Sequence, residues 1–197
     1  MSATGKLSVV LPVRDNQHDV VDRVERVLDA LAAMTRDVFE VVVVDDGSRD
    51  ATAQVLKELE SRHSQVRIAR HSRPRGMEAA GQTGLERATG EIVFIQESNT
   101  DVRIDDLHRL HQMTRDYSIV AARAESTPRP LSPSLLRRLR AFGTNADKQL
   151  KNPEVALQKS SMQMIRRPHL QQLAGPIGDD YDSVSYTHLT LPTILLV

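Results

Sequence analysis

Residues 39–44 (FEVVVV) place five apolar side chains in a run of six, and this run most constrains the fold. A strand with one face in water alternates apolar and polar residues. A nearly continuous apolar run is typical of a strand that helices cover on both faces. Residues 7–13 (LSVVLPV) are of the same kind, and residues 18–34 between the two runs carry apolar residues at helical spacing. The chain therefore begins with a strand, a helix and a second buried strand.

The alternation of strand and helix continues along the chain. Further strands are predicted at residues 66–69, 91–95 and 118–122, and a half-buried strand at Met162, Met164 and Ile165, which alternate with Gln163. Further helices are predicted after Asp50, which can cap the first of them, and at residues 77–88, 104–113, 135–150 and 168–173.

This order of elements predicts an α/β fold in a single domain. The sheet is expected to be doubly wound and mostly parallel, with helices on both faces. Ligands of such sheets bind beyond the carboxyl ends of the strands. A site is therefore expected where the chain leaves the sheet after Val13, Val44 and Ile95.

Composition and charge exclude several classes of function. The 197 residues are 40% apolar, and 26 Lys and Arg balance 26 Asp and Glu. Because there is no basic excess, we do not expect nucleic acid as a partner; the cluster of Arg137, Arg138 and Arg140 is interpreted as a solvated helix face. The absence of cysteine excludes disulfides and thiolate catalysis. No segment approaches the roughly 20 apolar residues that span a bilayer, so we expect a cytoplasmic protein and leave peripheral membrane association open.

The last 14 residues, 184–197 (VSYTHLTLPTILLV), differ abruptly in character from those before them. They resemble the translated adapter sequence that ends some fragmentary genes. We therefore expect the domain to span residues 1–183 and residues 184–197 to be a non-native tail, with a genuine edge strand as the alternative.

The strongest local signal is the segment VVVVDDGSRDAT at residues 41–52. A buried strand delivers Asp45 and Asp46 to its carboxyl end, followed by a Gly–Ser turn and a helix that Asp50 can cap. Carboxylates at this place can accept hydrogen bonds from the ring N–H of a nucleoside or from ribose hydroxyls. The alternative is that Asp46 and Asp50 only organise the turn and cap the helix. Spacing alone does not separate the two interpretations.

Four landmarks in the same order resemble the family 2 glycosyltransferases. VVVVDDGSRDAT is similar to their V-D-D-G-S-x-D-x-T signature, and LSVVLPV to their first strand. Residues 71–85 (HSRPRGMEAAGQTGL) resemble their N-x-G-x-x-x-A-x-N-x-G segment, and residues 88–95 (ATGEIVFI) the run before their metal motif. The resemblance implies a GT-A-type nucleotide-binding fold and an inverting transferase that uses a nucleoside-diphosphate sugar. Three classes of acceptor stay open: a polyprenyl phosphate, a glycan and a protein.

The resemblance also implies roles for individual residues. Pro12 and Val13 would border the base, and Asp45 and Asp46 would contact the base and ribose. Gly76 would lie in the turn that faces the nucleotide, and Gly84 would allow close packing of helix and sheet.

The metal motif departs from the family pattern. Family members carry Asp-x-Asp after the fourth strand, where carboxylates hold Mg²⁺ or Mn²⁺ against the diphosphate. Here the aligned triplet is Gln96-Glu97-Ser98, so Glu97 is the one remaining acidic ligand for a metal ion. A metal-independent arrangement is the alternative, in which Arg73 and Arg75 counter the charge of the diphosphate. Asp101 is interpreted as a residue at the start of the helix that follows, predicted at residues 104–113.

Other positions depart in the same direction. Arg14, Asp15 and Asn16 replace an aromatic residue, Asn and Glu, and Pro74, Met77 and Gln82 replace residues typical of the family.

No catalytic base is assigned among the acids Glu154, Asp179, Asp180 and Asp182. His108 and His111 share a helix face with Asp105, but zinc needs a further ligand, so we interpret them as surface residues.

Three functional hypotheses follow. The first is a glycosyltransferase that transfers a sugar from a nucleoside diphosphate to an acceptor with inversion. The second is a catalytically inactive relative that binds a nucleotide or a partner protein. The third is an unrelated α/β domain in which the DDGS turn is only structural.

Overall fold

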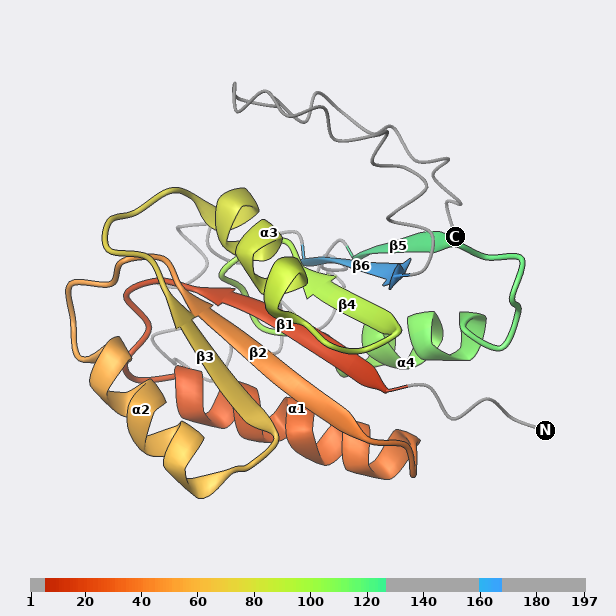
Figure 1. Cartoon of the computed structure of the whole chain (residues 1–197), viewed down its shortest axis with the longest axis horizontal. Coiled ribbons are helices and arrows are strands. Elements are labelled where there is room, and N and C mark those ends of the chain that lie inside the picture. Colours follow the sequence, from red (N-terminus) through yellow and green to blue (C-terminus); the bar gives the residue numbers. More distant parts are fainter. Residues whose placement is uncertain (1–5, 127–159, 168–197) are drawn as a thin grey trace, which may run out of the picture.

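The computed structural model describes residues 6–126 and 160–167. Its elements follow one another in the predicted order (Figure 1). They are β1 (Leu7–Val13), α1 (Val20–Met34), β2 (Phe39–Asp45), α2 (Thr52–Arg62), β3 (Val66–Arg70), α3 (Met77–Arg87), β4 (Ile92–Gln96), α4 (Ile104–Met113), β5 (Ala121–Ser126) and β6 (Ser160–Arg166).

The described strands form one six-stranded sheet in the order β3-β2-β1-β4-β6-β5. Strands β1 to β4 are parallel to one another, whereas β6 runs antiparallel to both β4 and β5. The predicted doubly wound, mostly parallel sheet is therefore confirmed. The carboxyl ends of β1, β2 and β4 lie at one edge of the sheet, as parallel pairing requires.

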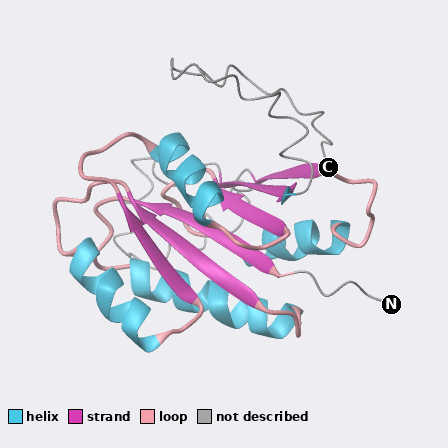
Figure 2. Ribbon diagram, viewed as in Figure 1, coloured by secondary structure: helices cyan, strands magenta, loops and turns pink. Residues whose placement is uncertain are grey.

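Helices cover both faces of the sheet (Figures 1 and 2). Side chains of α1, α2 and α4 share one buried cluster with one set of strand residues, such as Val9 and Val43. Side chains of α3 pack against the alternate set, such as Val10 and Val42. Every residue of β1 is buried, because adjacent side chains of this strand enter opposite cores.

Helix α3 lies close to the sheet because Gly84 has no side chain. A Cβ atom at this position would lie 2.1 Å from Cγ1 of Val10. The predicted role of Gly84 in close helix–sheet packing is confirmed.

The antiparallel end of the sheet agrees with the predicted core and differs from one predicted boundary. Met162 and Met164 are fully buried, as their alternation predicted. Strand β5 begins at Ala121 rather than at Ser118, because Ser118 belongs to a turn in which its N–H group donates to the Asp116 carboxylate at 2.9 Å. The predicted helices at 135–150 and 168–173 and the tail at 184–197 lie outside the described residues.

A buried carboxylate holds the amino-terminal edge of the sheet together. Oε1 of Glu40 accepts hydrogen bonds from the Ser8 hydroxyl at 2.7 Å and from the Thr89 N–H group at 2.6 Å. Oε2 forms ion pairs with Lys6 at 3.1 Å and Arg67 at 3.5 Å. Burial alone would raise the pKa of Glu40, but these donors outweigh it and lower the pKa to about 2. Glu40 thus links β1, β2, β3 and the loop before β4 far from the expected site.

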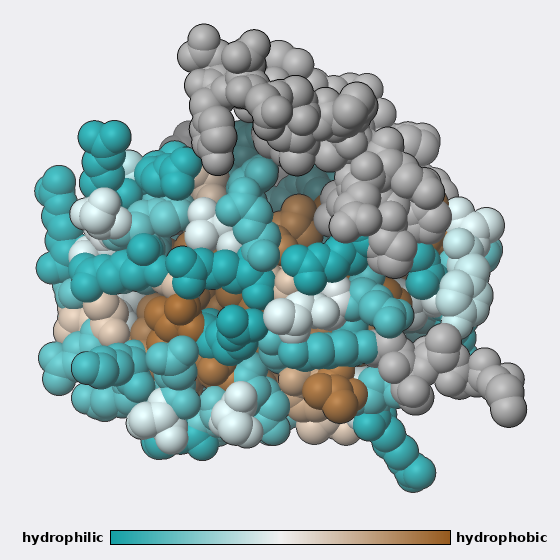
Figure 3. Space-filling model, in the orientation of Figure 1, coloured by the Kyte–Doolittle hydropathy of each residue, from teal (hydrophilic) through white to brown (hydrophobic). Residues whose placement is uncertain are grey.

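The surface of the described part is mainly polar. On the face seen in Figure 3, hydrophobic residues form small separate areas between hydrophilic ones. The large hydrophobic residues that are exposed include Val38 and Tyr117. Within residues 6–126 and 160–167, no helix is both long enough and apolar enough to cross a membrane.

Candidate functional site

The loops that follow β1 and β2 meet at the carboxyl edge of the sheet. Val13 pairs in register with Asp45, and the Asp46 N–H group donates to the Val13 carbonyl at 2.9 Å. Pro12 and Val13 are both buried at the end of β1. The residues predicted to border and contact a nucleoside are thus brought together at one place.

Asp45 is fully buried but keeps one oxygen without a hydrogen bond. Oδ1 accepts hydrogen bonds from the N–H group of Ser48, at 2.9 Å, and from its hydroxyl. Oδ2 lies 3.1 Å from Nε of Arg70 in an ion pair, yet it accepts no hydrogen bond from the described residues. The Arg70 side chain is about half exposed, and its Nη2 also donates to the Ser48 carbonyl at 3.2 Å. Asp45 therefore offers a buried acceptor at the edge of the sheet.

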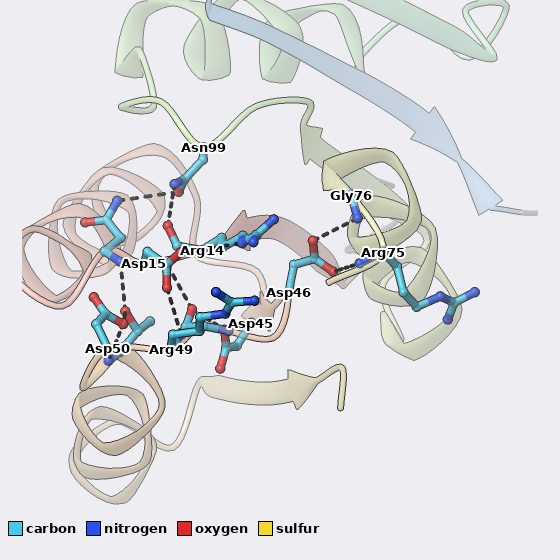
Figure 4. Close-up of polar contacts among 12 residues, drawn as sticks. Arg14, Asp15, Asp45, Asp46, Arg49, Asp50, Arg75, Gly76 and Asn99 are labelled. Atoms are coloured by element: carbon cyan, nitrogen blue, oxygen red, sulfur yellow. Dashed lines mark hydrogen bonds and ion pairs between the residues drawn. The ribbon is translucent and has the colours of Figure 1, made fainter. Parts of the chain in front are cut away.

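Asp46 is also fully buried, but its carboxylate is occupied by the protein. Oδ1 accepts from the Arg75 N–H group at 2.7 Å and pairs with Nδ1 of His71 at 2.8 Å, and Oδ2 accepts from the Gly76 N–H group at 2.8 Å (Figure 4). Burial works to raise the pKa of Asp46, but the bonds from His71, Arg75 and Gly76 outweigh it, so the pKa lies below its usual value. Asp46 therefore holds the loop before α3 in place, and its contact with a nucleotide stays a prediction.

Two side-chain hydrogen bonds connect Asp46 through His71 to Thr83 of α3. Nε2 of His71 lies 2.9 Å from the hydroxyl of Thr83, on the side of the ring opposite Asp46. Sequence reasoning missed His71 and Thr83: both lie in the landmark at residues 71–85, but neither stands at a fixed position of the N-x-G-x-x-x-A-x-N-x-G pattern.

Two glycines allow the backbone to bend at this edge. Gly47 has a φ of 67°, and a Cβ atom there would lie 2.8 Å from the Arg73 carbonyl carbon and the Pro74 nitrogen. Gly76 has a φ of 100° and presents its N–H group to Asp46. A side chain at either position would be strained. At Gly47 it would also collide with the backbone of Arg73 and Pro74, so the absence of a side chain lets the DDGS turn pack against the loop before α3.

Side chains also join the loops after β1 and β2. The Arg49 N–H group donates to Asp15 at 2.8 Å, and the Asp15 N–H group donates to the Ser48 hydroxyl at 2.9 Å. Asp50 accepts from the N–H groups of Thr52 at 3.0 Å and Gln17 at 3.1 Å. The N-cap of α2 is Ala51 rather than the predicted Asp50, but the Asp50 carboxylate accepts from the first N–H group of the helix, that of Thr52.

Gln96, the last residue of β4, and the loop that follows it, residues 97–100, are together called the β4 loop. Gln96 is buried, and its Nε2 donates to the Thr100 hydroxyl at 3.2 Å. Glu97 accepts hydrogen bonds from Nη2 of Arg123 at 2.6 Å, from its Nε at 3.1 Å, and from the side chain of Gln163. The carboxylate of Glu97 is thus directed toward β5 and β6 and is neutralised by a guanidinium group.

These residues do not fit a divalent metal ion. Mg²⁺ and Mn²⁺ require anionic oxygen ligands, whereas Gln96 and Ser98 are neutral and Glu97 is paired with Arg123. Among the residues that the structure describes, no group of three or more His, Asp or Glu side chains is arranged to hold a metal ion, the His108 and His111 pair included. A metal ion at Glu97 would have to displace Arg123 from this carboxylate.

The two arginines expected to counter the diphosphate lie in the loop beside Asp46. Arg73 and Arg75 are both exposed. Figure 4 shows the Arg75 side chain pointing away from Asp46, although the backbone of the same residue is bonded to that carboxylate. The cation role of Arg73 and Arg75 stays a prediction.

Arg23 of α1 is a site residue that sequence reasoning missed. It is 1% exposed and donates to the Ser98 carbonyl and to the Asn99 side chain, both at 3.2 Å. A sequence signal exists, because Arg23 stands three residues after Val20 and four before Val27 on the apolar stripe of the helix. A charged residue at a core position of an amphipathic helix needs a polar partner.

The remaining acidic residues divide into two groups. Asp101 forms an ion pair with Arg26 at 3.0 Å, next to the start of α4. The four acids considered for a catalytic base lie outside the described residues: Glu154, Asp179, Asp180 and Asp182. The arginine cluster at 137–140 lies outside them as well.

Several known proteins are similar to this chain in sequence. The model of the family "Glycosyl transferase family 2" matches residues 8–174. An undecaprenyl-phosphate 4-deoxy-4-formamido-L-arabinose transferase of Pseudomonas fluorescens is 33% identical over 105 residues, which cover 53% of this chain and 31% of that protein. A dolichol-phosphate mannosyltransferase of Pyrococcus furiosus is 25% identical over 116 residues, covering 59% of this chain and 32% of that protein.

Among solved structures, a mannosyltransferase of Pyrobaculum calidifontis in complex with GDP-Man and Mn²⁺ has 26% sequence identity and a TM-score of 0.48, covering 61% of this chain and 35% of that one. This chain spans about a third of the length of these relatives. The family model, in contrast, matches most of the chain, from β1 to beyond β6. The chain belongs to glycosyl transferase family 2.

Proposed function

We propose that this protein binds a nucleoside-diphosphate sugar at the carboxyl edge of β1 and β2 and transfers the sugar, with inversion, to a polyprenyl phosphate. Family membership supports glycosyl transfer. The names of two relatives, an undecaprenyl-phosphate transferase and a dolichol-phosphate transferase, support the class of acceptor.

The observation that carries the proposal is the buried carboxylate of Asp45. Its Oδ2 faces Arg70 in an ion pair but accepts no hydrogen bond from the described residues, whereas buried polar atoms are normally hydrogen-bonded. The N–H group of a base or a ribose hydroxyl would satisfy it. Asp46 has an indirect role, because its carboxylate holds the N–H groups of Arg75 and Gly76 in place beside the same edge of the sheet.

Transfer to a phosphate needs little acid–base chemistry from the protein. In the proposed reaction a phosphate oxygen of the acceptor attacks the anomeric carbon as the bond to the nucleoside diphosphate breaks on the opposite side, which inverts the configuration. A phosphate is already ionised near neutral pH, so no strong base has to remove a proton. The contribution of the described residues is therefore to bind and orient the donor.

Nucleotide binding tests the first half of the proposal. Thermal unfolding is measured with UDP, GDP, CDP and dTDP, each with Mn²⁺ and with EDTA. A ligand at about 100 times its dissociation constant adds roughly 2.7 kcal/mol to the stability of the folded state. One nucleotide is expected to raise the unfolding temperature of the wild type but not of Asp45→Asn, which keeps the shape and loses the charge. A folded wild type that responds to no nucleotide would refute the proposal.

Turnover tests the second half. The full chain is incubated with the matching nucleotide sugar and undecaprenyl phosphate, and the anomeric configuration of the product is read by NMR. Inverted product supports the proposal, and retained configuration contradicts it. Nucleotide binding without turnover would favour the second candidate, a catalytically inactive relative, which the neutral residues Gln96 and Ser98 and the pairing of Glu97 with Arg123 also favour.

A further inference from the structure

Arg23 places a positive charge directly beneath the β4 loop. Its Nη2 donates to the Ser98 carbonyl and its Nη1 to Oδ1 of Asn99, each at 3.2 Å. The side chain is almost fully buried, and its Nε has no hydrogen-bond partner among the described residues. Burial lowers the pKa of Arg23 to about 10, so the guanidinium remains charged at neutral pH. The loop is therefore built around a fixed cation.

The hydrogen bonds of Arg23 also set the direction of the loop backbone. In a trans peptide the C=O and N–H groups point to opposite sides. Since the Ser98 carbonyl is directed at Arg23, the N–H group of Asn99 is directed away from α1. The Asn99 side chain is fixed in turn, because its Nδ2 donates to the Arg14 carbonyl at 2.7 Å (Figure 4). Arg23 thus orients a loop that also contacts the end of β1.

The same loop lacks what a metal ion needs. Its one carboxylate, on Glu97, is bound by Arg123 and Gln163. A divalent cation near Ser98 would in addition be repelled by Arg23, and the protein interior screens that repulsion far less than water does. A loop with a built-in cation and neutral flanking residues favours an anionic ligand without a metal ion.

We propose that Arg23, in place of a divalent metal ion, supplies the positive charge of the β4 loop, and that this loop receives the diphosphate of the donor without metal. The inference rests on the proposed function, because the diphosphate belongs to the nucleotide sugar bound beyond β1 and β2. Arg23 acts from beneath the loop and is a positioning residue. Asp101 partly offsets its charge, but the Asp101 carboxylate also pairs with the neighbouring Arg26 at 3.0 Å.

Two variants and one control isolate the charge of Arg23. Arg23→Met removes the charge and keeps a long side chain. Asn99→Asp keeps the size of Asn99 and places a carboxylate against Arg23, so that it offsets the charge without removing the arginine, and it also removes the hydrogen bond to the Arg14 carbonyl. Lys57→Gln is the control, because it removes a positive charge from the exposed face of α2. Thermal unfolding confirms that each variant is folded.

The affinity for UDP, GDP, CDP and dTDP is measured by isothermal titration calorimetry, with EDTA and with excess Mn²⁺. The wild type is expected to bind one nucleotide equally well in both conditions. Arg23→Met and Asn99→Asp are expected to weaken this binding at least about tenfold, the loss typical of an interaction with a charged group. Lys57→Gln is expected to weaken it by less than about twofold, as for an exposed charge.

The outcomes separate this inference from the proposed function. Binding that requires Mn²⁺, or binding that both variants leave unchanged, overturns the role of Arg23 while the proposed function stands. Binding of no nucleotide in either condition overturns the proposed function and the inference with it. If Arg23→Met does not fold, Asn99→Asp alone decides, and an unchanged affinity in that variant overturns the inference.

Discussion

Replacing Glu40 with glutamine removes one negative charge from the amino-terminal edge of the sheet with almost no change in shape. The carboxylate accepts hydrogen bonds from Ser8 and Thr89 and pairs with Lys6 and Arg67. Glutamine cannot satisfy all of these donors, because one of its two terminal groups is itself a donor. We expect the variant to fold but to lose stability.

The magnitude follows from the pKa of Glu40. Burial would raise this pKa, but the surrounding donors lower it from 4.5 to about 2. Each unit of pKa is worth about 1.4 kcal/mol, so the ionised network contributes about 3 kcal/mol to the free energy of unfolding at neutral pH. Because the pKa is lower in the folded state, this contribution is complete above about pH 5. It is lost as the pH falls from there toward 2.

Urea unfolding followed by circular dichroism at a series of pH values tests this reasoning. At pH 7 Glu40→Gln is expected to be about 2–3 kcal/mol less stable than the wild type, and the difference should disappear as the pH approaches 2. Glu58→Gln, an exposed change on α2, is the control and should alter stability by less than about 0.5 kcal/mol. A Glu40→Gln variant as stable as the wild type at pH 7, or a difference that persists at acid pH, would refute the assignment.

Two further predictions concern helix α3 and the β4 loop. Gly84→Ala places a methyl group 2.1 Å from Cγ1 of Val10 and should lower the free energy of unfolding by about 1–3 kcal/mol. Gly81→Ala is the control, because its methyl group would lie 3.4 Å from the nearest atom, and it should be neutral or stabilising. Urea unfolding of both variants measures the difference. The double variant Gln96→Asp, Ser98→Asp should acquire nucleotide binding that depends on Mn²⁺, as calorimetry with and without EDTA can show, whereas the size-matched Gln96→Asn, Ser98→Asn should not.

Much of the fold was predictable from local sequence. Residues 39–44 indicate a doubly covered strand by their near-continuous apolar character, and the helical spacing of residues 18–34 predicts α1. The signature at residues 41–52 placed two carboxylates at the carboxyl end of β2, where the structure has them. These features depend on windows of about ten residues, in which the periods of helix and strand determine which side chains are buried.

The partners of the site residues were not predictable in this way. Neighbouring carboxylates in the sequence have different environments, since Asp45 faces Ser48 and Arg70 while Asp46 binds the loop before α3. The pairing of Glu97 with Arg123 depends on the register of β4, β6 and β5.

The contact of Arg23 with the β4 loop joins residues 75 positions apart. Local periodicity reports that Arg23 lies on the buried face of α1, but it does not report what the guanidinium meets there. The sequence by itself therefore determined the elements, their order and the edge of the sheet that carries the site. Only the tertiary structure decided which charges meet at that edge, because hydrogen bonds and ion pairs depend on distances between segments that only the packed sheet brings together.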